Sequence, residues 1–163
     1  MKYTKDLTLI AILTTILVVQ ELLLSYIPNI QLTVFLFVLY SKKLGVLKTA
    51  VINFIYVVLD NLLSGSFNFL FIPFMFIGWL MIPILLNTIF KRAKTNVTLA
   101  TLGVLFAFLY SFINIIPGCI AFNMTFLMYL KGDIVWEILL AISSFITILL
   151  LYNPCNRIFD RYI

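Results

Sequence analysis

The chain has 163 residues, of which 64% are hydrophobic and 10% are charged, and its mean hydropathy is +1.17. A water-soluble domain is about half apolar and about one quarter charged, so this composition excludes a water-soluble globule. The net charge is +5, but the basic residues form small clusters between apolar runs, which is a topology signal and not a nucleic-acid-binding surface.

The apolar runs predict an all-α integral membrane protein, a compact bundle of six transmembrane helices. A spanning helix needs roughly 20 mainly apolar residues, so six helices use about 120 residues and leave no room for a soluble domain. We therefore expect one domain over residues 1–163. The expected helices cover residues 7–27, 30–40, 44–63, 67–90, 97–122 and 133–152.

Prolines and small polar residues mark the ends and bends of these runs. Pro28 ends the first run, and residues 64–66 (Ser-Gly-Ser) end the third. Pro73 and Pro83 are expected to bend the fourth helix, because proline lacks the N–H of the helical hydrogen bond. Pro154 is expected to close the sixth helix, and a loop over residues 128–132 is expected to precede it.

The lysines and arginines predict the orientation of the bundle. With six spans, ten of these residues fall on the side of the N-terminus and only Lys131 falls on the other. Cytoplasmic loops carry the excess of Lys and Arg, so we expect both termini in the cytoplasm, in a bacterial-type cell membrane. The ten residues are Lys2, Lys5, Lys42, Lys43, Lys48, Lys91, Arg92, Lys94, Arg157 and Arg161.

The residues of common catalytic and metal sites are missing from the sequence. There is no histidine and no CxxC pair, so zinc, haem, Ser-His and Cys-His chemistry lack their usual ligands or base. The two cysteines, Cys119 and Cys155, are expected near opposite ends of the helices, too far apart for a disulfide. We expect no catalytic residue, no metal site and no cofactor.

Polar side chains gather in the half of the bundle opposite the basic clusters. Ionisable groups inside spans are costly, so they are candidates for function. Tyr56 and Asp60 share one helical face, as do Asp133, Trp136 and Glu137, and these faces could meet at one outward-facing cavity. The predicted substrate-binding residues are Gln20, Glu21, Gln31, Tyr56, Asp60, Asn61, Asn114, Asp133, Trp136 and Glu137.

Some of these positions fit a structural role as well. Asp60 and Asp133 lie near helix ends, where a carboxylate can reach the lipid headgroups, and Trp136 also fits an interfacial tryptophan. Glu21 lies about six residues, roughly 9 Å, below the expected end of its helix, which is deep for a headgroup contact. Trp79 is deeper in its span and is expected to serve in packing.

The first helix carries a step of small residues, Ala11 and Thr15, in its cytoplasmic half. Small residues four apart let another helix approach closely. From the spacing alone, packing within the chain is favoured over contact with a partner.

The expected chain has six helices, both termini inside, an outward-facing pocket and a step of small residues on its first helix. In this outline, and in three stretches of its sequence, it resembles the S components of energy-coupling factor (ECF) transporters. Residues 28–45 are similar to the family's first loop and second helix, which lead into a basic turn and a glycine. Residues 73–79 (Pro-Phe-Met-Phe-Ile-Gly-Trp) are similar to a fourth-helix segment, and residues 132–144 to the sixth helix. The resemblance covers nearly the whole chain, but its motifs are degenerate.

The resemblance implies a function and partners. An S component captures a vitamin or similar micronutrient on the extracellular side and pairs with a transmembrane T component and two cytoplasmic ATPases. It is thought to topple in the bilayer to deliver its ligand, with no catalysis of its own. The family's first helix meets the T component through an Ala-x-x-x-Ala patch, which Ala11 matches and Thr15 changes. The resemblance thus favours a partner contact for these two residues.

The charges predict the class of ligand. The outer half holds Glu21, Asp60, Asp133 and Glu137 but only Lys131 as a cation. Anionic vitamins such as biotin, folate or pantothenate would meet like charge there. A cationic or neutral heteroaromatic fits better, through carboxylate contacts and aromatic stacking. Thiamine or its pyrimidine precursor, a B6 vitamer and a queuosine precursor all qualify.

Three other functions remain open at the level of sequence. A stand-alone secondary transporter of a small cationic solute would use the carboxylates to relay protons. An intramembrane enzyme would use a Glu–Asp pair, but it would lack an activated nucleophile. A scaffold subunit would need no pocket.

Overall fold

The computed structural model describes residues 2–27, 29–63, 65 and 67–162, so the proposed span ends Pro28, Ser64 and Ser66 lie outside the described residues. The described residues form five helices and no strand. Four of these helices are long and apolar enough to cross a membrane, which indicates an α-helical membrane protein. The helices are α1 (Lys2–Leu24), α2 (Thr33–Leu63), α3 (Phe71–Asn87), α4 (Asn96–Phe122) and α5 (Phe126–Tyr162).

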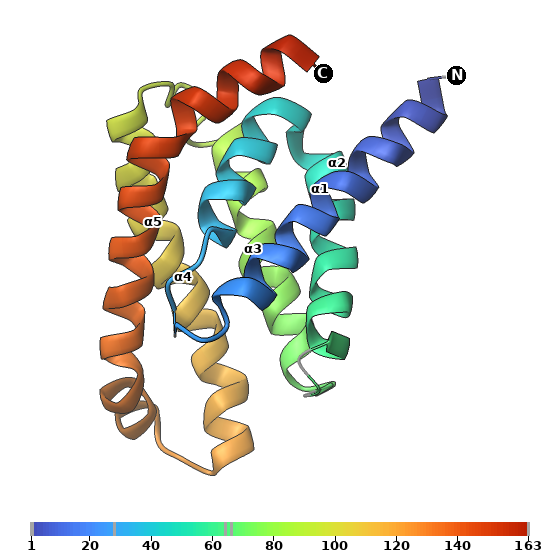
Figure 1. Cartoon of the computed structure of the whole chain (residues 1–163). Coiled ribbons are helices and arrows are strands. Elements are labelled where there is room, and N and C mark those ends of the chain that lie inside the picture. Colours follow the sequence, from blue (N-terminus) through green and yellow to red (C-terminus); the bar gives the residue numbers. More distant parts are fainter. Residues whose placement is uncertain (1, 28, 64, 66, 163) are drawn as a thin grey trace.

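The prediction of six helices is wrong, because the second and third expected spans belong to one element, α2. The gap expected between residues 40 and 44 stays helical, and the break comes at Gly45, whose φ of 77° and ψ of −174° are not helical. Figure 1 shows the two limbs of α2, residues 33–44 and 46–63, running in opposite directions from this point. The first limb covers only about 18 Å at 1.5 Å per residue, less than the roughly 30 Å of a bilayer core.

Helix α5 extends beyond the expected sixth span at both ends. Residues 126–132, expected to lie largely in a loop, form its first turns, and the helix continues through Pro154 to Tyr162. Proline removes one helical hydrogen bond and crowds the preceding turn, which bends a helix without ending it. In Figure 1 the last part of α5 lies across the end of the bundle. There Phe159 packs against Tyr40, with ring centroids 6.0 Å apart.

Helix α2 lies at the centre of the packing, because it contacts each of the other four helices. Its first limb is buried from Thr33 to Ser41, as expected for a short segment enclosed by the bundle. Helix α1 contacts α2 and no other described helix. The outer face of α1 therefore keeps large apolar side chains exposed, among them Leu7, Ile12 and Leu23.

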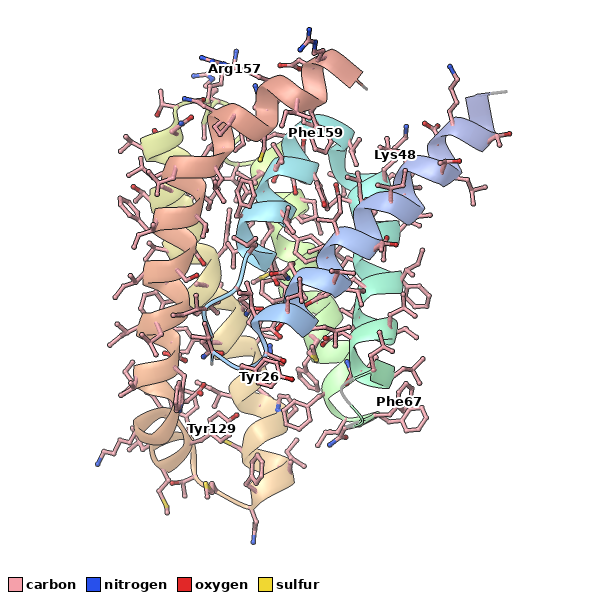
Figure 2. The ribbon with its side chains drawn as sticks, viewed as in Figure 1. Tyr26, Lys48, Phe67, Tyr129, Arg157 and Phe159 are labelled. Carbon is pink, nitrogen blue, oxygen red and sulfur yellow. The ribbon has the colours of Figure 1, made fainter. Side chains whose placement is uncertain are left out.

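The two ends of the bundle differ in charge. Both chain termini lie at one end (Figure 1), and Lys48 lies toward that end while Tyr129 lies toward the other (Figure 2). Lys48 Nζ is 2.7 Å from Asp6 Oδ1, and Lys43 Nζ is 2.5 Å from Asp160 Oδ1. These ion pairs connect α5 and α1 to α2, on either side of the break at Gly45.

The reversal at Gly45 yields a stability prediction. No atom lies within 4 Å of a Cβ added at this position, so an alanine would meet only backbone strain. Residues other than glycine pay about 1–3 kcal/mol in such a region, so Gly45→Ala should lower the thermal unfolding midpoint in detergent. Gly132→Ala is the matched control, because its Cβ is also free of contacts but its backbone is helical. Equal midpoints for both variants would contradict the role given to Gly45.

Candidate functional site

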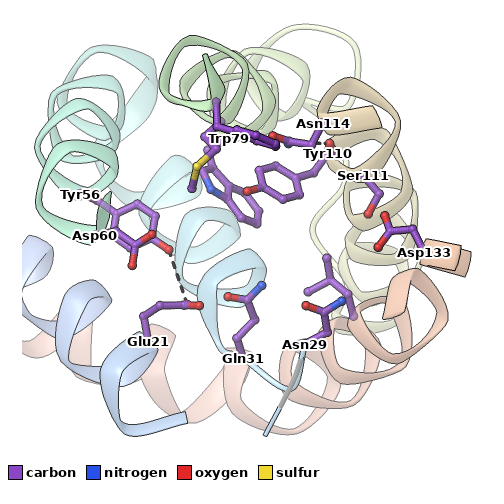
Figure 3. A pocket seen from close by; sticks show the side chains of 13 residues that line it. Glu21, Asn29, Gln31, Tyr56, Asp60, Trp79, Tyr110, Ser111, Asn114 and Asp133 are labelled. Atoms are coloured by element: carbon purple, nitrogen blue, oxygen red, sulfur yellow. Dashed lines mark hydrogen bonds between the residues drawn. The ribbon is translucent and has the colours of Figure 1, made fainter. Parts of the chain in front are cut away.

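A cavity of about 290 Å³ is enclosed by all five helices and by the connection between α1 and α2 (Figure 3). Polar and aromatic side chains dominate its wall, so it is more polar than most pockets that bind small molecules. The lining residues are Glu21, Asn29, Gln31, Tyr56, Asp60, Phe71, Met75, Trp79, Tyr110, Ser111, Asn114, Asp133 and Leu140.

The charge of this wall has one sign. Glu21, Asp60 and Asp133 contribute three carboxylates from three different helices, and none of the described lining residues is a lysine or arginine. Figure 3 shows Glu21 and Asp60 on one side of the cavity and Asp133 on another. Interactions between charges are strong where water is scarce, so the site favours a positively charged or hydrogen-donating ligand over an anion.

Glu21 is held in place by hydrogen-bond donors from α1 and α2. Its Oε2 accepts from Thr33 Oγ1 at 2.9 Å, from Gln20 Nε2 at 3.2 Å and from the Tyr56 hydroxyl at 3.5 Å. With its amide nitrogen turned toward Glu21, Gln31 donates to both carboxylate oxygens, at 2.5 and 2.9 Å. The carboxylate therefore has a fixed position at the cavity wall without a positively charged side chain beside it.

The structure brings together six of the ten predicted binding residues and places the other four outside the lining. The six are Glu21, Gln31, Tyr56, Asp60, Asn114 and Asp133. The four outside the lining are Gln20, Asn61, Trp136 and Glu137.

Two of these four residues, Gln20 and Asn61, are sequence neighbours of the lining residues Glu21 and Asp60. Gln20 is buried, donates to Thr33 Oγ1 at 2.7 Å and accepts from the Leu32 N–H at 2.8 Å, so it fastens the start of α2 to α1. Asn61 donates to the Val57 carbonyl at 2.9 Å and lines an adjoining pocket of about 270 Å³. Their contacts are those of positioning residues.

The other two residues belong to the N-terminal part of α5. Trp136 is 40% exposed and lines a separate, mostly apolar pocket of about 400 Å³ with Phe122 and Tyr129. Glu137 is 1% exposed, and neither of its carboxylate oxygens has a hydrogen-bond partner among the described residues.

An aromatic wall is the main feature of the cavity that sequence reasoning missed. Trp79, expected to serve in packing, does pack, but it also lines the cavity. Its ring stacks on Tyr110 with centroids 3.8 Å apart and on Phe37 at 5.5 Å. Gly78 permits this contact, because a Cβ there would lie 2.7 Å from Tyr110 Cδ2.

Spacing along the helices contains a signal for these missed residues. Phe71, Met75 and Trp79 are four residues apart and present one face of α3 to the cavity. Tyr110 lies one turn before Asn114, whose Nδ2 donates to the Tyr110 carbonyl at 2.9 Å. A helical-face search started from Asn114 would have found Tyr110.

The small-residue step of α1 faces away from the bundle. Ala11 and Thr15 are both exposed, so packing within the chain does not account for them. Thr15 Oγ1 donates to the Ala11 carbonyl at 2.9 Å, and Thr8 does the same to the Thr4 carbonyl. These hydroxyls are therefore satisfied within the helix, which leaves small side chains on an exposed part of α1.

Comparison with protein-family models, with curated proteins and with solved structures finds no match to this chain. Both cysteines are free, and the described residues contain no group of three or more His, Cys, Asp or Glu side chains that could hold a metal ion.

The network around Glu21 yields a second prediction. Thr33→Val keeps the side-chain shape but leaves the half-buried Glu21 without one donor and the buried Gln20 without one acceptor. We expect a loss of about 1–3 kcal/mol in unfolding free energy. Thr49→Val is the control, because Thr49 is equally buried but donates only to the Gly45 carbonyl in its own helix. Denaturant titration in detergent measures both; a smaller loss for Thr33→Val would contradict the network.

Proposed function

We propose that this chain is the substrate-binding subunit of an ECF-type ABC importer, which captures a vitamin-like molecule and passes it inward. One observation carries the proposal: a cavity built by all five helices, with three carboxylates, four aromatic residues from α2, α3 and α4, and no described cation in its wall. Such a wall serves recognition, since it contains no activated nucleophile.

The ligand we propose is a cationic or neutral heteroaromatic. Glu21, Asp60 and Asp133 would accept hydrogen bonds from its amino or ammonium groups, and Tyr110 and Trp79 supply aromatic surface beside them. A cavity of about 290 Å³ is at the low end for ligand pockets and suits a small molecule. Thiamine or its pyrimidine precursor, a B6 vitamer and a queuosine precursor meet these conditions.

The proposed orientation places the termini in the cytoplasm of a bacterial-type cell. Lys43 and Lys48 lie toward the end of the bundle that holds both termini, as the positive-inside rule requires of a cytoplasmic side. The cavity would then open to the outside through the connection between α1 and α2, where Glu21, Asn29 and Gln31 also line an adjoining pocket of about 240 Å³.

The proposed partners are a transmembrane T component and two cytoplasmic ATPase subunits. Ala11 and Thr15 would meet the T component, because they are small, exposed residues on a helix that contacts only α2 among the described helices. Small residues favour close helix–helix contact in a membrane, where lipid and helix surfaces are equally apolar. Energy would come from the ATPases, with no catalysis by this chain.

A second candidate is a stand-alone proton-coupled transporter of a small cationic solute. Glu137 favours it, since a buried carboxylate without a described hydrogen-bond partner is typical of intramembrane proton relays. Uptake by this chain alone, abolished by a protonophore, would support this candidate against the importer subunit. Uptake that requires the T component and ATP hydrolysis would support the importer.

Ligand charge can be tested with tryptophan fluorescence. The chain has two tryptophans, so Trp136→Phe leaves Trp79 in the cavity wall as the sole reporter. We expect thiamine to change its emission and biotin and pantothenate not to do so. Glu21→Gln should weaken thiamine binding at least tenfold, about 1.4 kcal/mol, because a charged hydrogen bond is lost.

The control for this substitution is Asp6→Asn, which removes a carboxylate that pairs with Lys48 at the other end of the bundle. It should leave thiamine binding unchanged. Mass spectrometry of small molecules that co-purify with the wild-type protein extends the search beyond these probes. Submicromolar binding of an anionic vitamin, undiminished by Glu21→Gln, would refute the proposed ligand class.

Assembly can be tested apart from ligand binding. Ala11→Trp places a large side chain on the exposed face of α1, so we expect it to prevent co-purification with candidate T and ATPase subunits while thiamine binding persists. Ile142→Trp is the matched control, because Ile142 is 51% exposed on α5. Loss of assembly in both variants, or in neither, would contradict a docking role for Ala11.

A further inference from the structure

A second polar cavity, of about 300 Å³, lies at the end of the bundle that holds both termini. Four lysines line it: Lys42 and Lys43 from the end of the first limb of α2, and Lys91 and Lys94 from the connection between α3 and α4. No carboxylate belongs to its described lining. This charge is opposite in sign to that of the cavity described above.

The acids at this end leave part of that charge uncompensated. Asp160 pairs with Lys43, and its side chain is 65% exposed, outside the cavity lining. Asp6 pairs with Lys48, which does not line the cavity. Neither Lys91 nor Lys94 forms an ion pair with any described residue, and both are exposed. Two ammonium groups therefore remain available to an anion.

The floor of the cavity is fixed by the third lysine. Lys42 is half-buried, and its Nζ donates to the carbonyls of Leu86 and Phe90 at 3.2 Å each, at the end of α3. The site is thus built from the anchored Lys42, the ion-paired Lys43 and two lysines without an ion pair to any described residue, Lys91 and Lys94.

Apolar side chains contribute to this basic cavity, and others lie close to its lysines along the chain. Leu86, Ala93 and Tyr152 contribute to its lining. Ile89, two residues before Lys91, is 71% exposed, and Val97, three residues after Lys94, is 62% exposed. An anion that brings its own hydrocarbon would satisfy both surfaces, whereas a free inorganic ion would satisfy only the lysines.

We propose that this cavity binds the phosphate headgroup of an anionic membrane phospholipid, with Lys91 and Lys94 on the phosphate and Ile89 and Val97 against the acyl chains. Basic pockets between transmembrane helices are suited to such headgroups, and each lysine adds to the attraction at the membrane surface. The proposal concerns the end of the bundle away from the carboxylate cavity, and it stands whether or not the proposed transport function is correct.

The test is native mass spectrometry of the full chain in mild detergent, titrated with phosphatidylglycerol or with phosphatidylcholine of the same acyl chains. We expect wild-type protein to retain one phosphatidylglycerol in preference to phosphatidylcholine. The double variant K91Q/K94Q should weaken retention of phosphatidylglycerol about tenfold. The control K5Q/R157Q removes the same charge from exposed positions that do not line the cavity, and it should change retention less than twofold.

Each other outcome overturns the proposal. Equal losses in the two double variants would mean that bulk charge alone attracts the lipid, and wild-type retention in K91Q/K94Q would mean that the cavity is not used. Inorganic phosphate is titrated in a separate arm; if it binds as tightly as phosphatidylglycerol and depends on the same two lysines, the occupant is a soluble anion and not a lipid. Unfolding midpoints are measured first, and Lys94→Gln alone replaces the double variant if that variant does not fold.

Discussion

A carboxylate inside an apolar helical bundle must be satisfied by hydrogen bonds, and Glu21 is where this constraint shapes the protein. Thr33, Gln20 and Gln31 all direct donors to it, and these residues come from α1, from the start of α2 and from the connection between them. Because α1 contacts only α2 among the described helices, this network secures the C-terminal end of α1 to the bundle. The same bonds fix one wall of the cavity.

The charges divide the molecule into two ends with different chemistry. The cavity enclosed by the five helices has three carboxylates, and the cavity at the end of the termini has four lysines. A bilayer core between the two cavities would separate the carboxylates from the lysines, because a charged side chain inside the bilayer is costly. The arrangement suits a protein that recognises a cation or hydrogen-bond donor at one membrane surface and an anion at the other.

Stacked aromatic rings join three helices in the middle of the bundle. Phe37 on the first limb of α2 stacks with Trp79 on α3, and Trp79 stacks with Tyr110 on α4. Trp79 is 1% exposed, so substitution of this residue would disturb both the core and the cavity wall. The same side chain therefore packs the core and lines the cavity, which is why an interpretation of Trp79 as packing alone was incomplete.

Much of the layout followed from composition and from the spacing of polar residues. Apolar runs long enough to cross a bilayer predicted helices, and the helix expected over residues 97–122 differs from the observed α4 by a single residue. Tyr56 and Asp60, four residues apart, share a face and both line the cavity, whereas of Asp133, Trp136 and Glu137, also predicted to share a face, only Asp133 lines it. The helix count failed at Gly45, since a glycine with positive φ can reverse the chain inside what remains one continuous element.

The sequence by itself determined that the protein is helical and membrane-embedded, and that its cations gather apart from most of its acids. Those properties depend on composition and on local spacing, which the chain carries in linear order. Only the tertiary structure decided that Glu137 is buried without a described partner outside the cavity lining, that Trp79 reaches the cavity and that Ala11 faces outward. Such outcomes depend on how helices rotate and approach one another, and that is set by contacts between residues far apart in the chain.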